Sequence, residues 1–216
     1  TQVQDITYRG PEGPRTPGHV SREHNVISVR LQDHVIFDME LLNRNFYMTS
    51  SCGVCGKASI EALEVQGCSV LAPGRPKLPA SVLDVLPQRL REGQAVFQRT
   101  GGLHAAGLFT PRGELQILRE DVGRHNAVDK VVGKGFLDDR LPLENRILVV
   151  SGRTSFEIVQ KVVKAGIPVV VAVGAPSSLA VELARSFGVT LVGFARGGGF
   201  NVYTGEERIL DWEVET

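Results

Sequence analysis

The last third of the chain alternates between short, wholly apolar runs and segments with helical spacing. The apolar runs are residues 147–150, 169–173 and 190–192, and the helical segments between them are 155–165 and 180–187. Strands that are apolar throughout are typical of a parallel sheet covered by helices on both faces. The pattern therefore predicts a β-α-β-α-β unit.

The middle of the chain predicts one strand and further helices. Residues 115–118 have the composition of a strand, and the apolar positions after Asn126 follow helical spacing. Helical spacing also covers residues 58–65 and 80–97. We expect Pro87 to break the second of these, because proline removes a backbone donor inside a helix.

The first fifty residues predict a small β-rich subdomain. Its expected strands are residues 26–31, 35–37 and 46–49. Residues 9–18 carry three Pro and three Gly, a composition that favours an extended or mobile segment. We therefore expect a subdomain at residues 1–50 and an α/β domain at residues 51–216.

The composition excludes some classes of partner. Among 216 residues, 24 Lys and Arg balance 24 Asp and Glu, so no overall charge attracts nucleic acid or an anionic membrane. No apolar run reaches the ~20 residues of a membrane helix, and residues 1–5 lack the pattern of a signal peptide. With three cysteines, these features lead us to expect a cytoplasmic protein in a reducing compartment.

Two cysteines, Cys52 and Cys55, stand three positions apart among small residues that leave sulfur accessible. A helix predicted to start near Ala58 and the positive charge of Lys57 both favour a thiolate. This pattern indicates redox chemistry or sulfur transfer. Alternatively, the pair is half of a zinc site or is inert, although a zinc ribbon needs a second pair and only Cys68 remains. We expect no bound metal and a structural role for Cys68.

Polar and Gly-rich segments follow each strand of the predicted unit. The carboxyl ends of parallel strands meet at one edge of a sheet, where ligands bind. These segments are residues 151–155, 174–178 and 194–200. In the first, Thr154 and Glu157 have the spacing of a capping box. In the third, bare backbone N–H groups and Arg196 suit a phosphate, and the aromatic residues at its ends suit a base or pterin. A triple Gly can also be a plain mobile turn.

Two further segments carry polar residues that have a structural alternative. Residues 119–126 lie at the start of a predicted helix, where N–H groups can bind an anion, or where Asp121 merely caps the helix. His104 follows two glycines and is either a buried core histidine or part of a pocket.

Four motifs together resemble the FdhD family, the sulfur carriers required for formate dehydrogenase activity. They are Ser51-Cys52-Gly53-Val54-Cys55-Gly56, Thr100-Gly101-Gly102-Leu103-His104-Ala105-Ala106, Glu120-Asp121-Val122-Gly123-Arg124-His125-Asn126-Ala127-Val128-Asp129-Lys130 and Ser151-Gly152-Arg153-Thr154-Ser155-Phe156-Glu157. They come in the family's order. The resemblance runs from about residue 50 to about residue 205.

The resemblance implies a sulfurtransferase that acts as a persulfide carrier. Cys52 would take sulfur from a cysteine desulfurase and pass it to the molybdenum of the bis(molybdopterin guanine dinucleotide) cofactor, before that cofactor enters formate dehydrogenase. Cys55 either resolves the persulfide or accompanies it. The resemblance further implies a homodimer and a cytidine-deaminase-like three-layer core with a mostly parallel sheet.

The expected cofactor-binding residues combine that resemblance with the polar edge of the sheet. They are His104, Arg124, His125, Ser151, Arg153, Phe194, Ala195, Arg196, Gly197, Gly198 and Gly199. GDP is the expected mimic of the bound substrate. The segment 194–199 departs from the Cys, Pro and second basic residue that some members carry.

Other classes remain as alternatives: a thiol-disulfide oxidoreductase, a zinc-binding deaminase-like protein and a non-catalytic nucleotide-binding module. Deamination is disfavoured, because His104-Ala105-Ala106 lacks the Glu that serves as general acid and base in zinc deaminases.

Overall fold

The computed structural model describes residues 2–9, 26–36 and 68–211. Contacts divide the chain into two compact units, residues 1–48 and 49–216. Each unit is described by itself. The predicted boundary at residue 50, the strand at 46–49 and the helix at 58–65 lie outside the described residues.

The described part of the first unit is an antiparallel pair of strands, β1 (Val3–Arg9) and β2 (Val26–Leu31). Strand β2 confirms the prediction for residues 26–31. Strand β1 was not predicted. The strand expected from residue 35 is wrong at Val35 and Ile36, which follow a turn and have no strand partner among the described residues.

The second unit is built on a six-stranded sheet in the order β5-β4-β6-β7-β8-β9. Its strands are β4 (His104–Phe109), β5 (Leu115–Asp121), β6 (Ile147–Val150), β7 (Val169–Ala172), β8 (Thr190–Arg196) and β9 (Gly199–Thr204). The pairs β6–β7 and β7–β8 are parallel, which confirms the predicted central unit. The pairs β4–β5, β4–β6 and β8–β9 are antiparallel, so the sheet is mixed.

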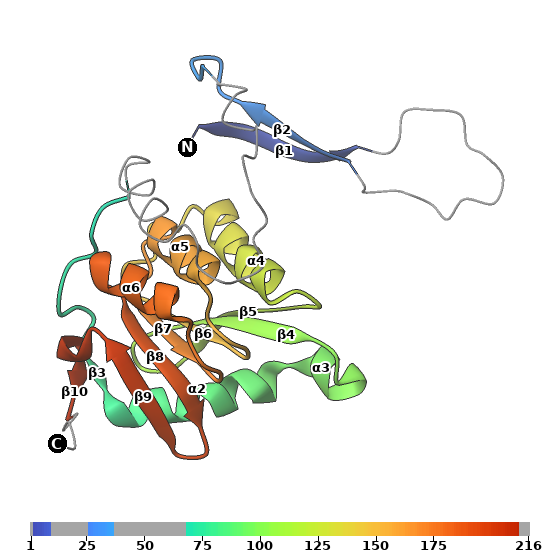
Figure 1. Ribbon diagram of the computed structural model, residues 1–216. Coiled ribbons are helices and arrows are strands. Elements are labelled where there is room, and N and C mark those ends of the chain that lie inside the picture. Colours follow the sequence, from blue (N-terminus) through green and yellow to red (C-terminus); the bar gives the residue numbers. More distant parts are fainter. Residues whose placement is uncertain (1, 10–25, 37–67, 212–216) are drawn as a thin grey trace. The chain divides into compact units, whose positions relative to one another are not determined.

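Helices cover both faces of this sheet, as the apolar strands predicted (Figure 1). Helices α4 (Arg124–Leu137), α5 (Phe156–Lys164) and α6 (Ser178–Ser186) lie on one face. Helix α2 (Ala80–Gly93) lies on the other, and the short helix α3 (Ala95–Thr100) follows it. The result is a three-layer α/β arrangement; the likeness to cytidine deaminases stays a prediction.

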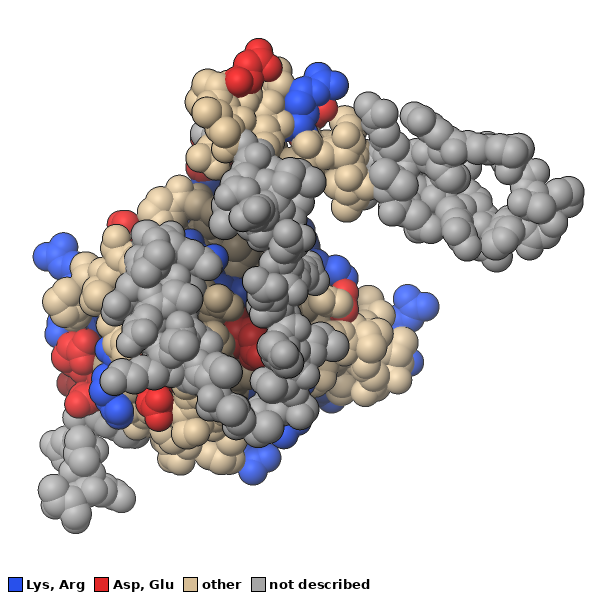
Figure 2. Space-filling view, turned by 45° about the horizontal axis from the view of Figure 1, so that its top comes forward, with Lys and Arg blue, Asp and Glu red and all other residues tan. Residues whose placement is uncertain are grey.

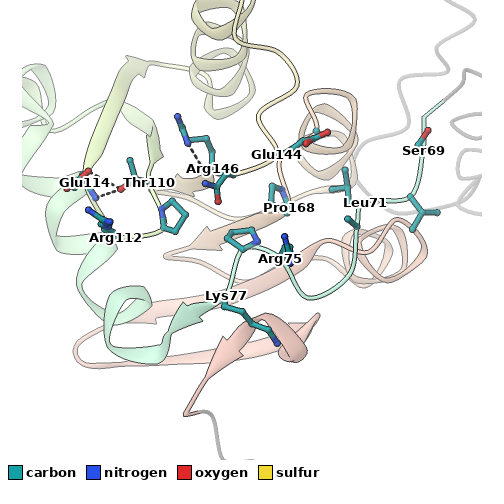
Figure 3. A pocket seen from close by; sticks show the side chains of 16 residues that line it. Ser69, Leu71, Arg75, Lys77, Thr110, Arg112, Glu114, Glu144, Arg146 and Pro168 are labelled. Atoms are coloured by element: carbon teal, nitrogen blue, oxygen red, sulfur yellow. Dashed lines mark hydrogen bonds between the residues drawn. The ribbon is translucent and has the colours of Figure 1, made fainter.

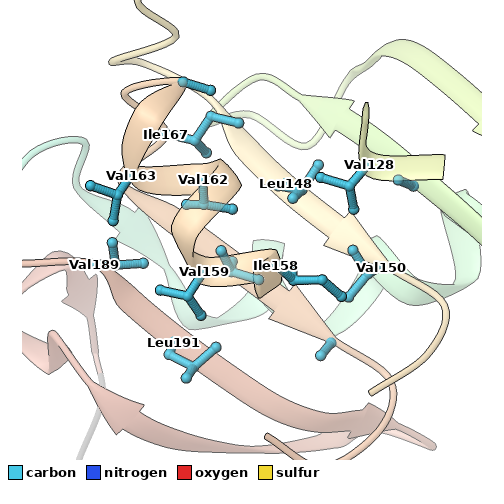
Figure 4. Packing of buried hydrophobic residues seen from close by; sticks show 14 of the residues in the cluster. Val128, Leu148, Val150, Ile158, Val159, Val162, Val163, Ile167, Val189 and Leu191 are labelled. Carbon is cyan, nitrogen blue, oxygen red and sulfur yellow. The ribbon is translucent and has the colours of Figure 1, made fainter. Parts of the chain in front are cut away.

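The strands are apolar throughout because each face supports a separate core. Leu148 and Val150 of β6 pack with Val159 and Val162 of α5 on one face (Figure 4). Their neighbour Val149 packs with the α2 side on the other face. Alternate residues of a strand point to opposite faces, so an apolar residue is needed at every position.

Helix α2 passes through Pro87 without a break, contrary to the sequence prediction. Leu83, Leu86 and Leu90 form one buried face that spans the proline. Their burial offsets the ~3 kcal/mol that an interior proline costs. The helix ends instead at Gly93, and Gln94 separates it from α3.

A buried arginine holds the end of the described chain. Strand β10 (Ile209–Leu210), which follows the 3-10 helix η2 (Glu206–Arg208), pairs in parallel with β3 (Leu78–Pro79). Arg208 is fully buried and donates hydrogen bonds to the carbonyls of Ala72 and Arg75 and to the hydroxyl of Thr190. Burial lowers the pKa of its guanidinium.

Candidate functional site

The sheet topology brings predicted residues from distant parts of the chain to one edge. Strand β4 runs antiparallel to β6, so its first residue, His104, lies beside the end of β6, which leads into Ser151. His104 also faces Asp121, the last residue of β5, and helix α4 begins three residues later at Arg124. This edge, where β6 and β7 end, is the one that the sequence predicted.

Two glycines, Gly152 and Gly174, allow the chain segments that form this edge to pack closely against one another. A Cβ atom on Gly152 would lie 3.3 Å from His104 Nδ1 and 3.9 Å from Arg124 Cδ. A Cβ atom on Gly174 would lie 3.0 Å from Arg153 Cγ. The backbone at both positions is therefore in close contact with predicted site residues.

The sheet divides the predicted residues between its two faces. Ala106 packs on the face of α4 and α5, and Ala105 packs on the face of α2. Alternation along β4 and the contact through Gly152 place His104 on the α4 face. Ser151 continues the alternation of β6 on the α2 face, where its Oγ accepts a hydrogen bond from Ala105 N at 2.9 Å. Ser151 thus belongs to a different part of the site from Arg124.

Asp121 binds three residues at the start of α4, which favours a structural role for its carboxylate over a role in ligand binding. Its Oδ1 accepts hydrogen bonds from Gly123 N at 2.9 Å and Asn126 Nδ2 at 3.1 Å, and Lys130 Nζ lies 2.5 Å from Oδ2. The hydrogen bond from Lys130, followed by that from Gly123, lowers the pKa of Asp121 to about 2. Its carboxylate is therefore ionised at neutral pH and occupied by these donors.

His125 joins α4 to the start of α5. Its Nε2 lies 2.9 Å from Ser155 Oγ and 3.8 Å from a carboxylate oxygen of Glu157. Burial, and then the positive charge of Arg124, lower the pKa of His125. A neutral ring at this position can exchange a proton with a hydroxyl.

The predicted capping box is wrong. Ser155 is the N-cap residue of α5, and Thr154 lies outside the helix. Backbone hydrogen bonds hold Thr154 between the loops after β6 and β7: its N–H donates to Ala175 O, and its carbonyl accepts from Ser177 N. The sequence spacing alone could not show this, because the contact depends on the parallel pairing of β6 and β7.

The Gly-rich segment is a hairpin rather than an open loop. Strand β8 runs to Arg196, β9 starts at Gly199, and Gly197 and Gly198 form the turn with φ of 64° and 84°. A two-residue turn with positive φ at both positions suits glycine, because other residues are strained there. The structure therefore shows a tight turn between two paired strands, and a role of these glycines in binding stays a prediction.

Within this hairpin the predicted residues point in different directions. Ala195 is buried in the α2-side core, so only its backbone can contact a ligand. Phe194 is 39% exposed and has a φ of 53°, which is strained for a non-glycine residue. Its N–H leaves the strand ladder and donates to Gly174 O at 3.2 Å.

A cavity of about 350 Å³ lies beside Ser151 on the α2 side. We call it the Gln94 cavity. It is lined by Arg91, Gln94, Phe97, Gly101, Gly102, Leu103, His104 and Ser151. Gln94 and Arg91 were not predicted, and no sequence signal marks them, because α2, α3 and β6 meet only in the folded chain.

A larger hollow, of about 1060 Å³, lies at the opposite edge, where β6 and β7 begin (Figure 3). Its charged lining residues are Arg75, Lys77, Arg112, Glu114, Glu144 and Arg146. On the face shown in Figure 2, charges of both signs are interspersed. Among the described residues, no buried unpaired polar atom lines this hollow, and no predicted site residue belongs to it. We therefore place the candidate site at the other edge.

Three buried side-chain atoms have no hydrogen-bond partner within the described part of the chain, and all lie toward the candidate edge. They are Gln94 Nε2, Arg124 Nε and Thr154 Oγ1. Buried polar atoms are usually paired. Their grouping near Ser151 and Gly152 supports this edge as the place where a ligand binds.

The structure describes Cys68 but not the other two cysteines. Cys52 and Cys55 lie outside the described residues. Cys68 is half-buried and packs against the core on the α4 side, in keeping with a structural role. Across residues 2–9, 26–36 and 68–211, no three His, Cys, Asp or Glu side chains gather as metal ligands. In the same residues, no helix has the length and apolar content to cross a bilayer.

Comparison with known proteins gives consistent matches over most of the chain. A profile of the FdhD/NarQ family matches residues 15–210. The chain is 55% identical over 209 residues to the sulfur carrier protein FdhD of Streptomyces avermitilis, covering 96% of this chain and 73% of that protein. It is 52% identical to the protein of the same name from Mycobacterium tuberculosis, covering 91% and 72%.

A solved structure extends the comparison to the fold. The crystal structure of a protein assigned as a formate dehydrogenase accessory protein, from Desulfotalea psychrophila, matches with a TM-score of 0.60 at 35% identity. The match covers 69% of this chain and 62% of that one. The chain therefore spans less than two thirds of that structure's length.

Proposed function

The chain belongs to the FdhD/NarQ family, and from this premise we propose that it is a sulfur carrier that serves formate dehydrogenase. The observation that carries the proposal is identity above 50%, over more than nine tenths of this chain, to proteins named sulfur carrier protein FdhD. Both Cys52 and Cys55 lie within the region that matches the family. A sulfur carrier needs at least one thiol that can hold the sulfur as a persulfide, and a pair of cysteines supplies it.

In the proposed loading step, the Cys52 thiolate attacks the terminal sulfur of a persulfide on a cysteine desulfurase. A new S–S bond forms on Cys52, and the desulfurase cysteine leaves as a thiolate, so no net oxidation occurs. A free thiol with a pKa of ~8.5 is mostly protonated at neutral pH. The positive charge of Lys57 is our candidate for favouring the thiolate.

Two delivery routes are compatible with a pair of cysteines. In the direct route the terminal sulfur moves to molybdenum, which supplies the two electrons that return Cys52 to a thiolate. In the other, Cys55 attacks Cys52 Sγ, a disulfide closes, and the sulfur leaves as hydrosulfide. Both routes conserve atoms and electrons.

We propose that the acceptor, the molybdenum bis(molybdopterin guanine dinucleotide) cofactor, binds as substrate along the edge from His104 to the β8–β9 hairpin. Arg124, Arg153 and Arg196 supply positive charge there for its phosphates. The helix α4 begins at the same edge, and a helix N-terminus favours an anion. Formate dehydrogenase and a second copy of this chain are the proposed protein partners.

The test is mass spectrometry of the chain after incubation with a cysteine desulfurase and cysteine. We expect one added sulfur, located on Cys52. Cys68→Ala, at a cysteine packed against the core, is the matched control and should load normally. Retained loading and retained activation of formate dehydrogenase in Cys52→Ala would contradict the proposal.

Cys55→Ala separates the two delivery routes. The direct route predicts that this variant still activates formate dehydrogenase. The disulfide route predicts a persulfide that stays on Cys52.

A further inference from the structure

The large hollow at the edge where β6 and β7 begin is formed by four separate parts of the chain (Figure 3). They are residues 69–77, the β4–β5 turn at 110–114, residues 144–146 before β6 and residues 166–168 before β7. Its volume of about 1060 Å³ slightly exceeds the ~300–1000 Å³ that is usual for small-molecule sites. This size suits an extended segment of polypeptide better than one small molecule.

Most of the charged side chains in this hollow are positive. Its lining carries Arg75, Lys77, Arg112 and Arg146, against the two carboxylates of Glu114 and Glu144. The whole chain has equal numbers of basic and acidic residues, so this excess is local. It attracts a partner that is mainly negative.

The positive charges of the hollow are not neutralised by the fold. In the part of the chain that the structure describes, none of these four cations forms an ion pair with a carboxylate. Lys77 Nζ donates to the carbonyl of Glu207 at 2.6 Å, and Arg146 Nη1 donates to the carbonyl of Asn145 at 2.7 Å. A carbonyl oxygen carries no net charge, so both cations can still attract an anionic group.

The cations are spread over the hollow instead of converging on one point. Figure 3 shows Arg75, Arg112 and Arg146 apart from one another, on segments that enter the hollow separately. A site for a single phosphate or carboxylate brings its donors together around that group. Alternate side chains of an extended peptide are ~6.6 Å apart, so successive carboxylates of such a peptide can reach separate cations.

The rest of the lining favours a polypeptide over a nucleic acid. Its apolar part consists of Pro76, Pro111, Pro168, Leu71 and Val70, and the Val70 side chain is 65% exposed. None of the described lining residues is aromatic, so the hollow offers no ring on which a base can stack. The two carboxylates would also repel a continuous phosphate backbone, whereas aliphatic side chains of a peptide can rest on the prolines and Val70.

We propose that the large hollow is a docking site for an extended, acidic segment of a partner protein. Carboxylates of the segment pair with Arg75, Arg112 and Arg146, and aliphatic side chains between them contact the apolar part of the lining. Exposed charge pairs of this kind act mainly on the rate of association and on the choice of partner. The inference goes beyond the proposed function, because no predicted site residue lines this hollow.

The experiment is fluorescence anisotropy of the full chain with a short fluorescein-labelled peptide of glutamates interrupted by two leucines. We expect binding at low salt that weakens as salt screens the charges. Combining Arg112→Glu with Arg146→Glu should weaken binding about tenfold or more, because each change replaces an attraction with a repulsion. Glu144→Gln removes a repulsive charge and should tighten binding about twofold. Loss of folding cannot produce this opposite effect.

Matched controls separate the hollow from the overall charge of the chain. Arg99→Glu with Arg185→Glu makes the same change in net charge at exposed residues outside the hollow, and should bind the peptide like the wild type. A peptide with glutamine in place of glutamate should bind far more weakly. Circular dichroism shows whether each variant is folded.

The inference is overturned if the wild type does not bind the acidic peptide, or if the two double variants weaken binding equally, because net charge alone would then explain the result. The same titration with a labelled single-stranded oligonucleotide tests the other polyanion. An oligonucleotide that binds as tightly as the peptide, and is weakened as much by Arg112→Glu with Arg146→Glu, would overturn the assignment to an acidic polypeptide.

Discussion

The backbone N–H of Phe194 donates a hydrogen bond to the carbonyl oxygen of Gly174 at 3.2 Å, which ties the end of β8 to the segment that follows β7. On its other side, Gly174 packs against Arg153 in the segment after β6. A single glycine therefore holds together three chain segments that the sequence places at the candidate edge.

We expect Gly174→Ala to destabilise the protein. The new Cβ would lie 3.0 Å from Arg153 Cγ, and 3.1 Å from both Arg153 N and Gly152 O, so backbone atoms would have to move. Such overpacking costs about 1–3 kcal/mol of unfolding free energy, measurable by urea denaturation. Gly133→Ala is the control, because a Cβ there meets nothing within 4 Å inside α4, and it should stabilise by about 0.5–1 kcal/mol.

Arg208→Met is expected to lower the free energy of unfolding by about 3 kcal/mol or more. The substitution keeps much of the side-chain volume but leaves the carbonyls of Ala72 and Arg75 without their donor. Arg112→Met, at an exposed position, should change stability by less than about 0.5 kcal/mol. Equal denaturation midpoints for the two variants would show that the buried contacts of Arg208 contribute little.

The fold shows which structural features can be predicted from the sequence alone. The strands and helices of residues 147–192 were predicted correctly, because burial on both faces of a sheet requires apolar strands and amphipathic helices, and both are visible in the sequence. Helix α2 was not, because the packing of Leu83, Leu86 and Leu90 outweighs the local effect of Pro87. Local rules fail where tertiary packing decides the outcome.

The candidate site shows the same division. His104, Arg124 and Ser151 were predicted from the family resemblance together with the polar edge of the predicted sheet, and the structure brings them to one edge. That Ser151 and Arg124 lie on opposite faces depends on strand register, which the sequence does not contain. Gln94 left no signal, because its burial is produced by the meeting of separate elements.

The stability of the wild type should fall as the pH drops through the range in which unfolded histidine titrates. The folded-state pKa of His125 is lowered by burial, so below an unfolded pKa of ~6.5 the unfolded chain binds more protons than the folded one. The test is urea denaturation at about pH 7 and about pH 5.5. His125→Gln should reduce this fall, whereas His34→Gln, at an exposed position in the first unit, should not. The same pH dependence in both variants would contradict the prediction.

Asp121→Asn should destabilise the start of α4 at neutral pH. The carboxylate accepts hydrogen bonds from Gly123 and Asn126 and pairs with Lys130, and its pKa is lowered to about 2. A lowered folded pKa contributes stability above the unfolded value of ~3.9, and that contribution is lost as the pH falls toward 2. The difference between wild type and variant in unfolding free energy should therefore shrink across this acid range. A constant difference would assign the effect to packing instead.

Arg153→Gln should weaken the binding of GDP but not that of guanosine. Arg153 is exposed at the end of β6, next to Gly152 and Gly174, so it can reach the phosphates of a nucleotide without supporting the fold. Loss of one charge-assisted hydrogen bond costs about 1.5–3 kcal/mol, which corresponds to roughly a tenfold or larger loss of affinity. Arg112→Gln, at the opposite edge of the sheet, should change neither affinity. If Arg153→Gln weakened guanosine and GDP equally, Arg153 would contact the base or the sugar, and the phosphates would have to lie elsewhere along the edge.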